Sequence, residues 1–302
     1  MGGELKDKKR SRLKGSKDKR GWGRWLEFKA RRRVLHPVDF ALRKFMVAKQ
    51  LLSNGAADQI SLSRKEGWAR IEPGTLPLTK EVVDSCVSLF HRRKPELEAV
   101  FDTRASKSDT YFYDVAAEQG FGEVSDLLIE YVTQPALLNS VIRYLGDFPI
   151  FQGASLYWTP PNSKAVSSQL WHLDNLDSRQ VKFFLYLNDI DKGAGPTTIL
   201  PIGATQEVVK RTGYDGGKIS DEEVAACVPP ENWIVLEGPK ETLIACDTSS
   251  CLHFGGRARE RERLFVMFHY STSAPFAFEK RWKVPARNLR ERLLFAASPG
   301  RH

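Results

Sequence analysis

A histidine and an aspartate stand two residues apart in the segment QLWHLDNLDSRQVKFFLYLND, which covers residues 169–189. Side chains of a β-strand alternate between its two faces, so His172 and Asp174 are expected to point to the same side. An imidazole and a carboxylate placed in this way could share one ligand, and both groups bind metal ions. The segment therefore marks a candidate metal site at the start of a strongly strand-like run.

A third ligand of such a site would come from one of the other histidines. Three of the six lack a carboxylate or histidine partner in a strand-like context: His36, His91 and His302. His253 lies on a short run just before a glycine turn and is the favoured third ligand, whereas His269 in an apolar strand is the less favoured alternative. Two histidines and one carboxylate occupy half of an octahedron, which leaves Fe(II) free to bind a cosubstrate and O₂ together.

An arginine on the same apolar strand as His269 suggests an anion inside the fold. Even spacing places Arg263, Phe265, Met267 and His269 on one face of this strand. A buried, unpaired guanidinium costs several kcal/mol, and a dicarboxylate would satisfy it through a two-pronged hydrogen bond. A structural ion pair with an Asp or Glu is the alternative for Arg263. For His269 we expect a hydrogen-bonded core histidine.

The order of apolar patterns predicts helices first and a β-rich core after them. Amphipathic helical patterns dominate before Asp147, and at least seven short β-rich runs follow it. We expect a mainly β sandwich or barrel over residues 147–275, a helical region over 22–146 packed against it, and a helix and tail over 276–302. The run VKFFLYL is apolar on both faces, so helices must cover the outer side of its sheet. Three loops are expected to shape the pocket mouth: 53–78, 103–123 and 203–220.

Positive charge is concentrated at the N-terminus. The chain of 302 residues has a net charge of +9, but residues 1–33 alone carry +10, so the remainder is close to neutral. Residues 1–21 are predicted to form a basic, disordered tail that touches anionic surfaces only non-specifically. No apolar run approaches a membrane span, and the first residues lack a secretory signal. Four scattered cysteines fit reduced thiols in the cytoplasm.

Three segments together resemble the phytanoyl-CoA dioxygenase (PhyH)-like branch of the Fe(II)/2-oxoglutarate oxygenases. They are QLWHLD, VKFFLYLNDIDKGAGPTTILP and HFGGRARERERLFVMFHY, and the resemblance covers roughly residues 135–275. It implies a double-stranded β-helix, a jelly-roll and cupin-like core. It also implies that His172, Asp174 and His253 bind Fe(II) and that Arg263 holds the distal carboxylate of 2-oxoglutarate.

The resemblance also suggests candidates for further contacts with the cosubstrate. Some family members carry a hydroxyl residue two positions after the distal histidine, where this chain has Gly255. Four other residues are candidates for holding 2-oxoglutarate: Thr197, Gln169, Lys182 and Tyr157. Asp174 occupies the position where the halogenase variant has a small residue, so a hydroxylase is favoured over a halogenase.

The resemblance implies an enzyme that hydroxylates a small molecule, with 2-oxoglutarate and O₂ as cosubstrates and succinate as coproduct. A second hypothesis is a metal-binding barrel without oxygenase activity, such as a Zn(II) hydrolase, a cupin-like isomerase or a pseudoenzyme, because zinc accepts the same ligands. Such a protein has no need of Arg263 as an anchor for a dicarboxylate. A third hypothesis gives the basic tail a role in binding nucleic acid.

Overall fold

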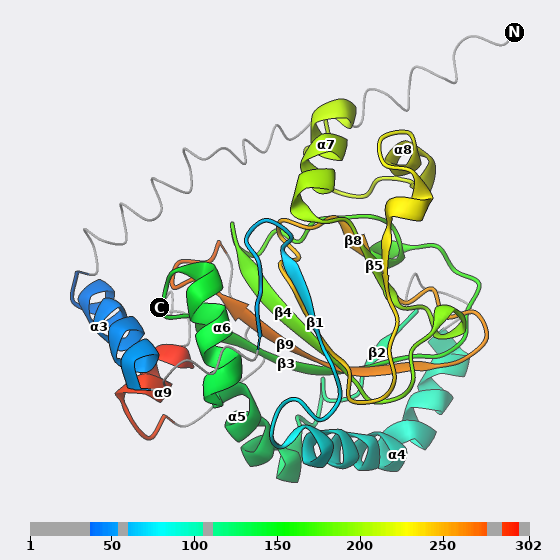
Figure 1. The fold of residues 1–302 in the computed structure, drawn as a ribbon. Coiled ribbons are helices and arrows are strands. Elements are labelled where there is room, and N and C mark those ends of the chain that lie inside the picture. The colour runs from blue at the N-terminus through cyan, green and yellow to red at the C-terminus, as the bar shows by residue number, and fades with distance from the viewer. Residues whose placement is uncertain (1–36, 54–59, 105–110, 277–285, 296–302) are drawn as a thin grey trace, which may run out of the picture.

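The computed structural model describes residues 37–53, 60–104, 111–276 and 286–295 (Figure 1). The predicted basic tail over residues 1–21 lies outside these ranges. Helix α3 (Pro37–Ser53) is the first described element, and helix α9 (Leu289–Leu294) is the last. Within the described residues, no helix is both long and apolar enough to cross a membrane.

The larger of two antiparallel sheets has six strands in the order β1–β7–β4–β9–β3–β2. Its strands are β1 (Trp68–Ile71), β2 (Tyr113–Asp114), β3 (Ile150–Thr159), β4 (Gln180–Tyr186), β7 (Leu243–Cys246) and β9 (Arg263–Ser271). Lys182 on the central strand β4 lies opposite both Cys246 and His269. The strand-like run after Asp174 is therefore in the middle of the sheet.

The smaller sheet has three strands in the order β6–β5–β8, namely β6 (Ile234–Leu236), β5 (Thr197–Ile199) and β8 (His253–Phe254). Two bridges extend it beyond β8. His172 pairs with His253, and Trp171 pairs with Ile219. Cys246 and Ile199, from the two different sheets, belong to one apolar cluster. The two sheets therefore share a core between them.

Helices cover the other face of the larger sheet (Figure 1). They are α4 (Thr79–Arg104), α5 (Ser125–Thr133) and α6 (Pro135–Leu145), with α3 and α9 beside them. Val181, Phe183 and Leu185 of β4 are fully buried in the cluster that includes these helices, whereas Phe184 and Tyr186 face the smaller sheet. The prediction that β4 is buried on both faces and covered by helices is confirmed.

All three predicted loops contain regular structure, and strand β2 lies inside the predicted loop 103–123. Strand β1 lies inside the predicted loop 53–78, and helix α7 (Ile202–Thr212) occupies much of the predicted loop 203–220. Strand β1 has only four residues, and the α7 sequence IGATQEVVKRT is rich in poor helix formers. The local sequence therefore does not indicate either element. The remaining short elements are α8 (Asp221–Ala225) and the 3₁₀ turns η1 (Gly122–Val124), η2 (Ser167–Gln169), η3 (Lys192–Ala194) and η4 (Pro230–Asn232).

Candidate metal centre and anion site

His172, Asp174 and His253 come together at one end of the smaller sheet. One ligand atom from each of them lies within 4.8 Å of the others. The Nε2 atoms of His172 and His253 are each 3.9 Å from a carboxylate oxygen of Asp174. Both imidazoles are buried and the carboxylate is half-buried, so the three donors line a sheltered but reachable position. This spacing suits a single metal ion bound between them.

Backbone pairing fixes the three ligands relative to one another. The amide of His172 donates to the carbonyl of His253 at 3.0 Å, and the amide of His253 donates back at 3.1 Å. The Asp174 amide donates to the carbonyl of Thr248 at 2.9 Å. Two backbone hydrogen bonds between the same two residues hold them directly opposite each other. The centroids of the two imidazole rings are therefore only 4.2 Å apart. Sheet pairing thus brings His253 beside His172, although the two residues lie far apart in the sequence.

The hydrogen bonds of the two histidines select one tautomer. Nδ1 of His172 donates to the carbonyl of Leu170 at 2.8 Å, and Nδ1 of His253 donates to that of Cys251 at 3.0 Å. Each Nε2 therefore keeps its lone pair and faces Asp174. Burial lowers the pKa of His172 to about 3 and also lowers the pKa of His253. Both rings are neutral at physiological pH, as metal binding requires.

Asp174 is held as a carboxylate by its neighbours on β4. One of its oxygens accepts from Lys182 at 2.9 Å and from Gln180 at 3.1 Å. Burial alone would raise the pKa of Asp174, but the ammonium of Lys182, together with the two histidines, holds it well below its usual range. The site thus contains an ionised oxygen ligand beside two neutral nitrogen ligands.

Gln180 connects the candidate ligands to the interior of the larger sheet. Its amide nitrogen donates to Thr248 at 2.6 Å as well as to Asp174. Its amide oxygen lies 2.9 Å from Nε2 of His269, which places the proton of that ring on Nε2. The prediction that His269 is a hydrogen-bonded core histidine is confirmed. Gln180 and Thr248 were not predicted, although Gln180 shares a strand face with Lys182.

Arg263 is buried without an acidic partner among the described residues. Arg263 is only 4% exposed, and its guanidinium lies 4.2 Å from the ring centre of Phe265. Nη2 donates to the hydroxyl of Thr197 at 2.6 Å, while Nε has no hydrogen-bond partner. Burial lowers the pKa of Arg263, but a guanidinium stays charged in proteins. A structural ion pair, the alternative considered from the sequence, is not found in the described ranges.

Gly255 leaves room for this guanidinium. A Cβ atom at position 255 would lie 2.9 Å from Nη1 of Arg263 and 3.3 Å from the hydroxyl oxygen of Thr197. The hydroxyl next to the guanidinium comes from Thr197 on the neighbouring strand β5. Gly255 is two residues beyond His253, so the guanidinium of Arg263 lies against the segment that carries this candidate metal ligand.

The other predicted cosubstrate contacts have different surroundings. Lys182 lies in the ion pair with Asp174 described above. The amide nitrogen of Gln169 donates to Asn162 in its own loop and to the carbonyl of Gly256 just after β8, so this side chain fastens the loop to that segment. Tyr157 lies opposite Phe265 on β3 and packs against its ring at 5.4 Å between centroids. Contact of any of these side chains with a cosubstrate stays a prediction.

Two further residues border the site and were not predicted. The hydroxyl of Tyr111 is hydrogen-bonded to that of Ser168, and its ring covers Gly256, close to Arg263. Lys218 precedes Ile219, which pairs with Trp171, so it lies opposite His172 on the same side of the extended sheet. Both are supplied by segments that carry no motif, which is why the sequence alone did not single them out.

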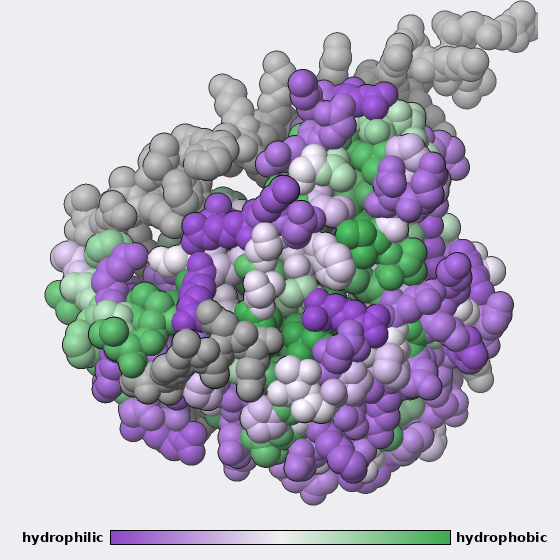
Figure 2. Space-filling view, in the orientation of Figure 1, coloured by the Kyte–Doolittle hydropathy of each residue, from purple (hydrophilic) through white to green (hydrophobic). Residues whose placement is uncertain are grey.

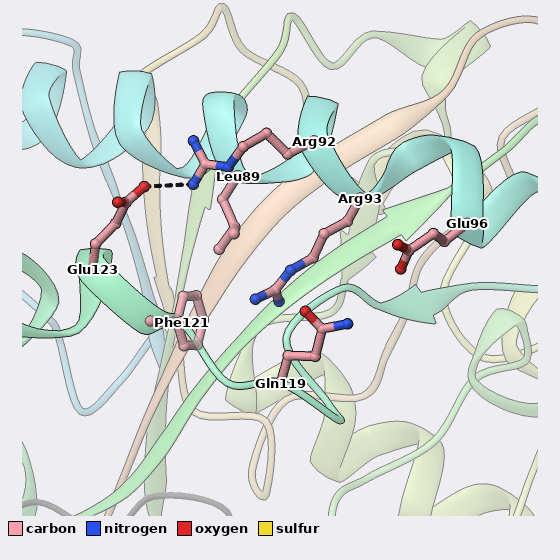
Figure 3. A pocket seen from close by; sticks show the side chains of 8 residues that line it. Leu89, Arg92, Arg93, Glu96, Gln119, Phe121 and Glu123 are labelled. Atoms are coloured by element: carbon pink, nitrogen blue, oxygen red, sulfur yellow. Dashed lines mark hydrogen bonds and ion pairs between the residues drawn. The ribbon is translucent and has the colours of Figure 1, made fainter.

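A surface hollow of about 350 Å³ lies elsewhere, on the helix side of the fold (Figure 3). Arg92 of α4 crosses it to reach Glu123 at 2.6 Å, and Arg93 donates to the carbonyls of Val115 and Gly120. None of the candidate metal ligands lines it. Its arginines are already hydrogen-bonded, so we assign it no role in the site.

No family model and no curated protein matches the chain. Among solved structures, the chain is similar to EctD from S. alaskensis in its apoform, with 14% identity, 81% of this chain and 87% of that chain covered, and a TM-score of 0.50. Despite the low identity, this likeness shows that the two share a fold.

Two further structures match with lower TM-scores. EctD from S. alaskensis with 2-oxoglutarate and 5-hydroxyectoine is 13% identical over 76% of this chain and 83% of that chain, with a TM-score of 0.47. The epimerase SnoN in complex with Fe³⁺, alpha ketoglutarate and nogalamycin RO is 15% identical over 74% and 88%, with a TM-score of 0.43.

Proposed function

We propose that this protein is an Fe(II)/2-oxoglutarate-dependent dioxygenase that hydroxylates a small molecule, built on a double-stranded β-helix of the PhyH-like type. The observation that carries the proposal is Arg263, a buried cation without a carboxylate partner in the described residues, whose guanidinium lies against Gly255, two residues beyond the candidate ligand His253. A site that binds only a metal has no use for such a group.

The donor set fits Fe(II). Two neutral imidazole nitrogens and one carboxylate are the ligands that non-haem iron oxygenases use, and no fourth His, Cys, Asp or Glu joins the cluster in the described ranges. His172, Asp174 and His253 would hold the ion. Bound Fe(II), with 2-oxoglutarate and O₂, supplies the oxidation of a substrate C–H bond while 2-oxoglutarate is converted to succinate and CO₂.

The residues of this chain have separate tasks in that reaction. Arg263 binds the distal carboxylate of 2-oxoglutarate, and Thr197 orients the guanidinium through the 2.6 Å hydrogen bond. Gln180 and Lys182 fix the carboxylate of Asp174. The carbonyls of Leu170 and Cys251 hold the two imidazoles in the tautomer that binds metal. The apolar cluster between the sheets keeps bulk water away from the reacting atoms.

Calorimetry of 2-oxoglutarate binding to the Mn(II)-loaded protein without O₂ tests the proposal. We expect Arg263→Ala to weaken this binding by at least about a hundredfold, because a charged hydrogen-bonded pair is lost from a buried position. Mn(II) binding should persist in that variant and be lost in Asp174→Ala. The matched control is Arg261→Ala, which removes an exposed arginine two residues away.

A hydrolase, isomerase or pseudoenzyme would give a different result. If the wild-type protein loaded with Mn(II) does not bind 2-oxoglutarate, or if Arg263→Ala binds it as well as the wild type, the oxygenase proposal is wrong. If instead the wild type binds 2-oxoglutarate and Arg263→Ala does not, a screen of small molecules for succinate formation with Fe(II) and O₂ identifies the substrate.

A further inference from the structure

Helix α3 carries a continuous apolar stripe on its exposed side. Val38, Phe45 and Leu52 are 70%, 60% and 83% exposed, and Ala41 and Ala48 between them are exposed as well. The spacing of three and four residues places all five on one face of the helix. Apolar side chains gather over α3 at the left of the space-filling view (Figure 2). Contiguous apolar surface of this kind marks an interaction site.

The orientation of α3 is fixed from its opposite side. Arg43 is buried and donates to the carbonyls of Phe148 and Leu293, both at 3.0 Å. Gln50 donates to Asn139 of α6 at 3.1 Å, and Met46 is part of the main core. The stripe is therefore the outer face of α3, because the opposite face of the helix already has its own buried partners.

The exposed charged side chains of α3 are both lysines. Among the described side chains of α3, the exposed ones are Pro37, the five members of the stripe, Lys44 and Lys49. The two lysines flank the stripe on either side of the helix. Residues 1–33, which precede α3 by only three residues in the chain, carry a net charge of +10. No exposed acid lies on the helix to attract a second copy of this cationic face.

We infer that α3 docks on an anionic lipid surface, with its apolar stripe at the boundary of headgroups and acyl chains and the basic residues among the headgroups. An apolar helix face and a polybasic segment are each weak membrane signals, but together they give stable attachment. A helical protein partner would need acidic residues on both sides of its apolar face to pair with these lysines. A second copy of this chain would instead place its own lysines against them, and the like charges would repel. This inference is independent of the proposed oxygenase function.

Sedimentation of the full chain with vesicles tests the inference. We expect binding to vesicles of phosphatidylcholine with about 30% phosphatidylserine and at least about tenfold weaker binding to phosphatidylcholine alone, with the difference reduced by salt. The variant Val38→Gln, Phe45→Gln, Leu52→Gln should lose at least about tenfold in affinity for the anionic vesicles. All three positions are exposed, so the fold should be kept, which circular dichroism and Mn(II) binding would check.

The matched control is Val235→Gln, which removes an exposed apolar side chain from β6 and should leave vesicle binding unchanged. In a second measurement, Phe45→Trp should give additional fluorescence that brominated acyl chains quench. Three results overturn the inference: no binding to anionic vesicles, equal binding of the triple variant and the wild type, or a dimer in solution that the triple variant abolishes.

Discussion

Replacing Lys182 by Met should make the metal-free protein less stable and yet make it bind a divalent cation more tightly. Lys182 is 2.9 Å from Asp174, and their side chains are only 12% and 18% exposed. Removing one partner of a buried ion pair costs about 3–5 kcal/mol. Because Gln180 still donates to Asp174, we expect a loss of about 3 kcal/mol in the free energy of unfolding.

The effect on metal affinity is decided by two opposing contributions. A divalent cation bound to Asp174 lies on the order of 5 Å from the Lys182 ammonium, so their repulsion is about 6–7 kcal/mol at an effective dielectric constant of about 20. Loss of the orienting hydrogen bond weakens affinity by about 10–100-fold, or about 1.4–2.8 kcal/mol. Repulsion is the larger contribution, so Lys182→Met should bind Mn(II) at least about tenfold more tightly.

Mn(II) titration followed by electron paramagnetic resonance measures the affinity without 2-oxoglutarate, and denaturant unfolding measures the stability with and without Mn(II). Lys182→Arg keeps the charge and serves as the control, with an affinity close to that of the wild type. Weaker Mn(II) binding by Lys182→Met would refute this reasoning, because orientation rather than repulsion would then dominate.

Three more predictions concern the same site. Burial lowers the pKa of His172 to about 3 from 6.5, so this residue should remove about 2 kcal/mol of stability as the pH falls from 6.5 to 5, and denaturant unfolding of His172→Gln should lack that component. Gly255→Ser would crowd the guanidinium of Arg263, and calorimetry should show 2-oxoglutarate binding weakened by about tenfold. Thr197→Val removes the hydroxyl that accepts from Arg263, and should likewise weaken binding about tenfold, whereas unchanged affinity would contradict the orienting role.

The sequence was sufficient for the parts of the site that follow from strand alternation. The two-residue spacing correctly brought His172 and Asp174 to one site, although Asp174 lies beyond the bridge at His172, and the face that contains Arg263 and His269 follows from strand alternation. The burial of β4 on both faces was equally visible in its apolar run. These features depend only on local pattern, which sheet formation preserves.

Other features depend on pairing between distant segments. Gln180 contacts Thr248, which is 68 residues away, and nothing in either residue type indicates that contact. Thr197 was one of four equivalent candidates until the pairing of β5 with β8 placed it beside Arg263. Strand β1 and helix α7 were missed because their positions come from packing on the sheets rather than from strong intrinsic propensity.

The charges of the site explain why a metal and a dicarboxylate should bind together. Asp174 is ionised, Lys182 and Arg263 are cationic, and the two histidines are neutral, so these five side chains together carry one excess positive charge. A divalent cation alone adds to this excess in a sheltered position, where charge is costly. A dianion alone would be held by Arg263 at one end only. Bound together, the two neutralise each other, so each should raise the affinity for the other by the same factor.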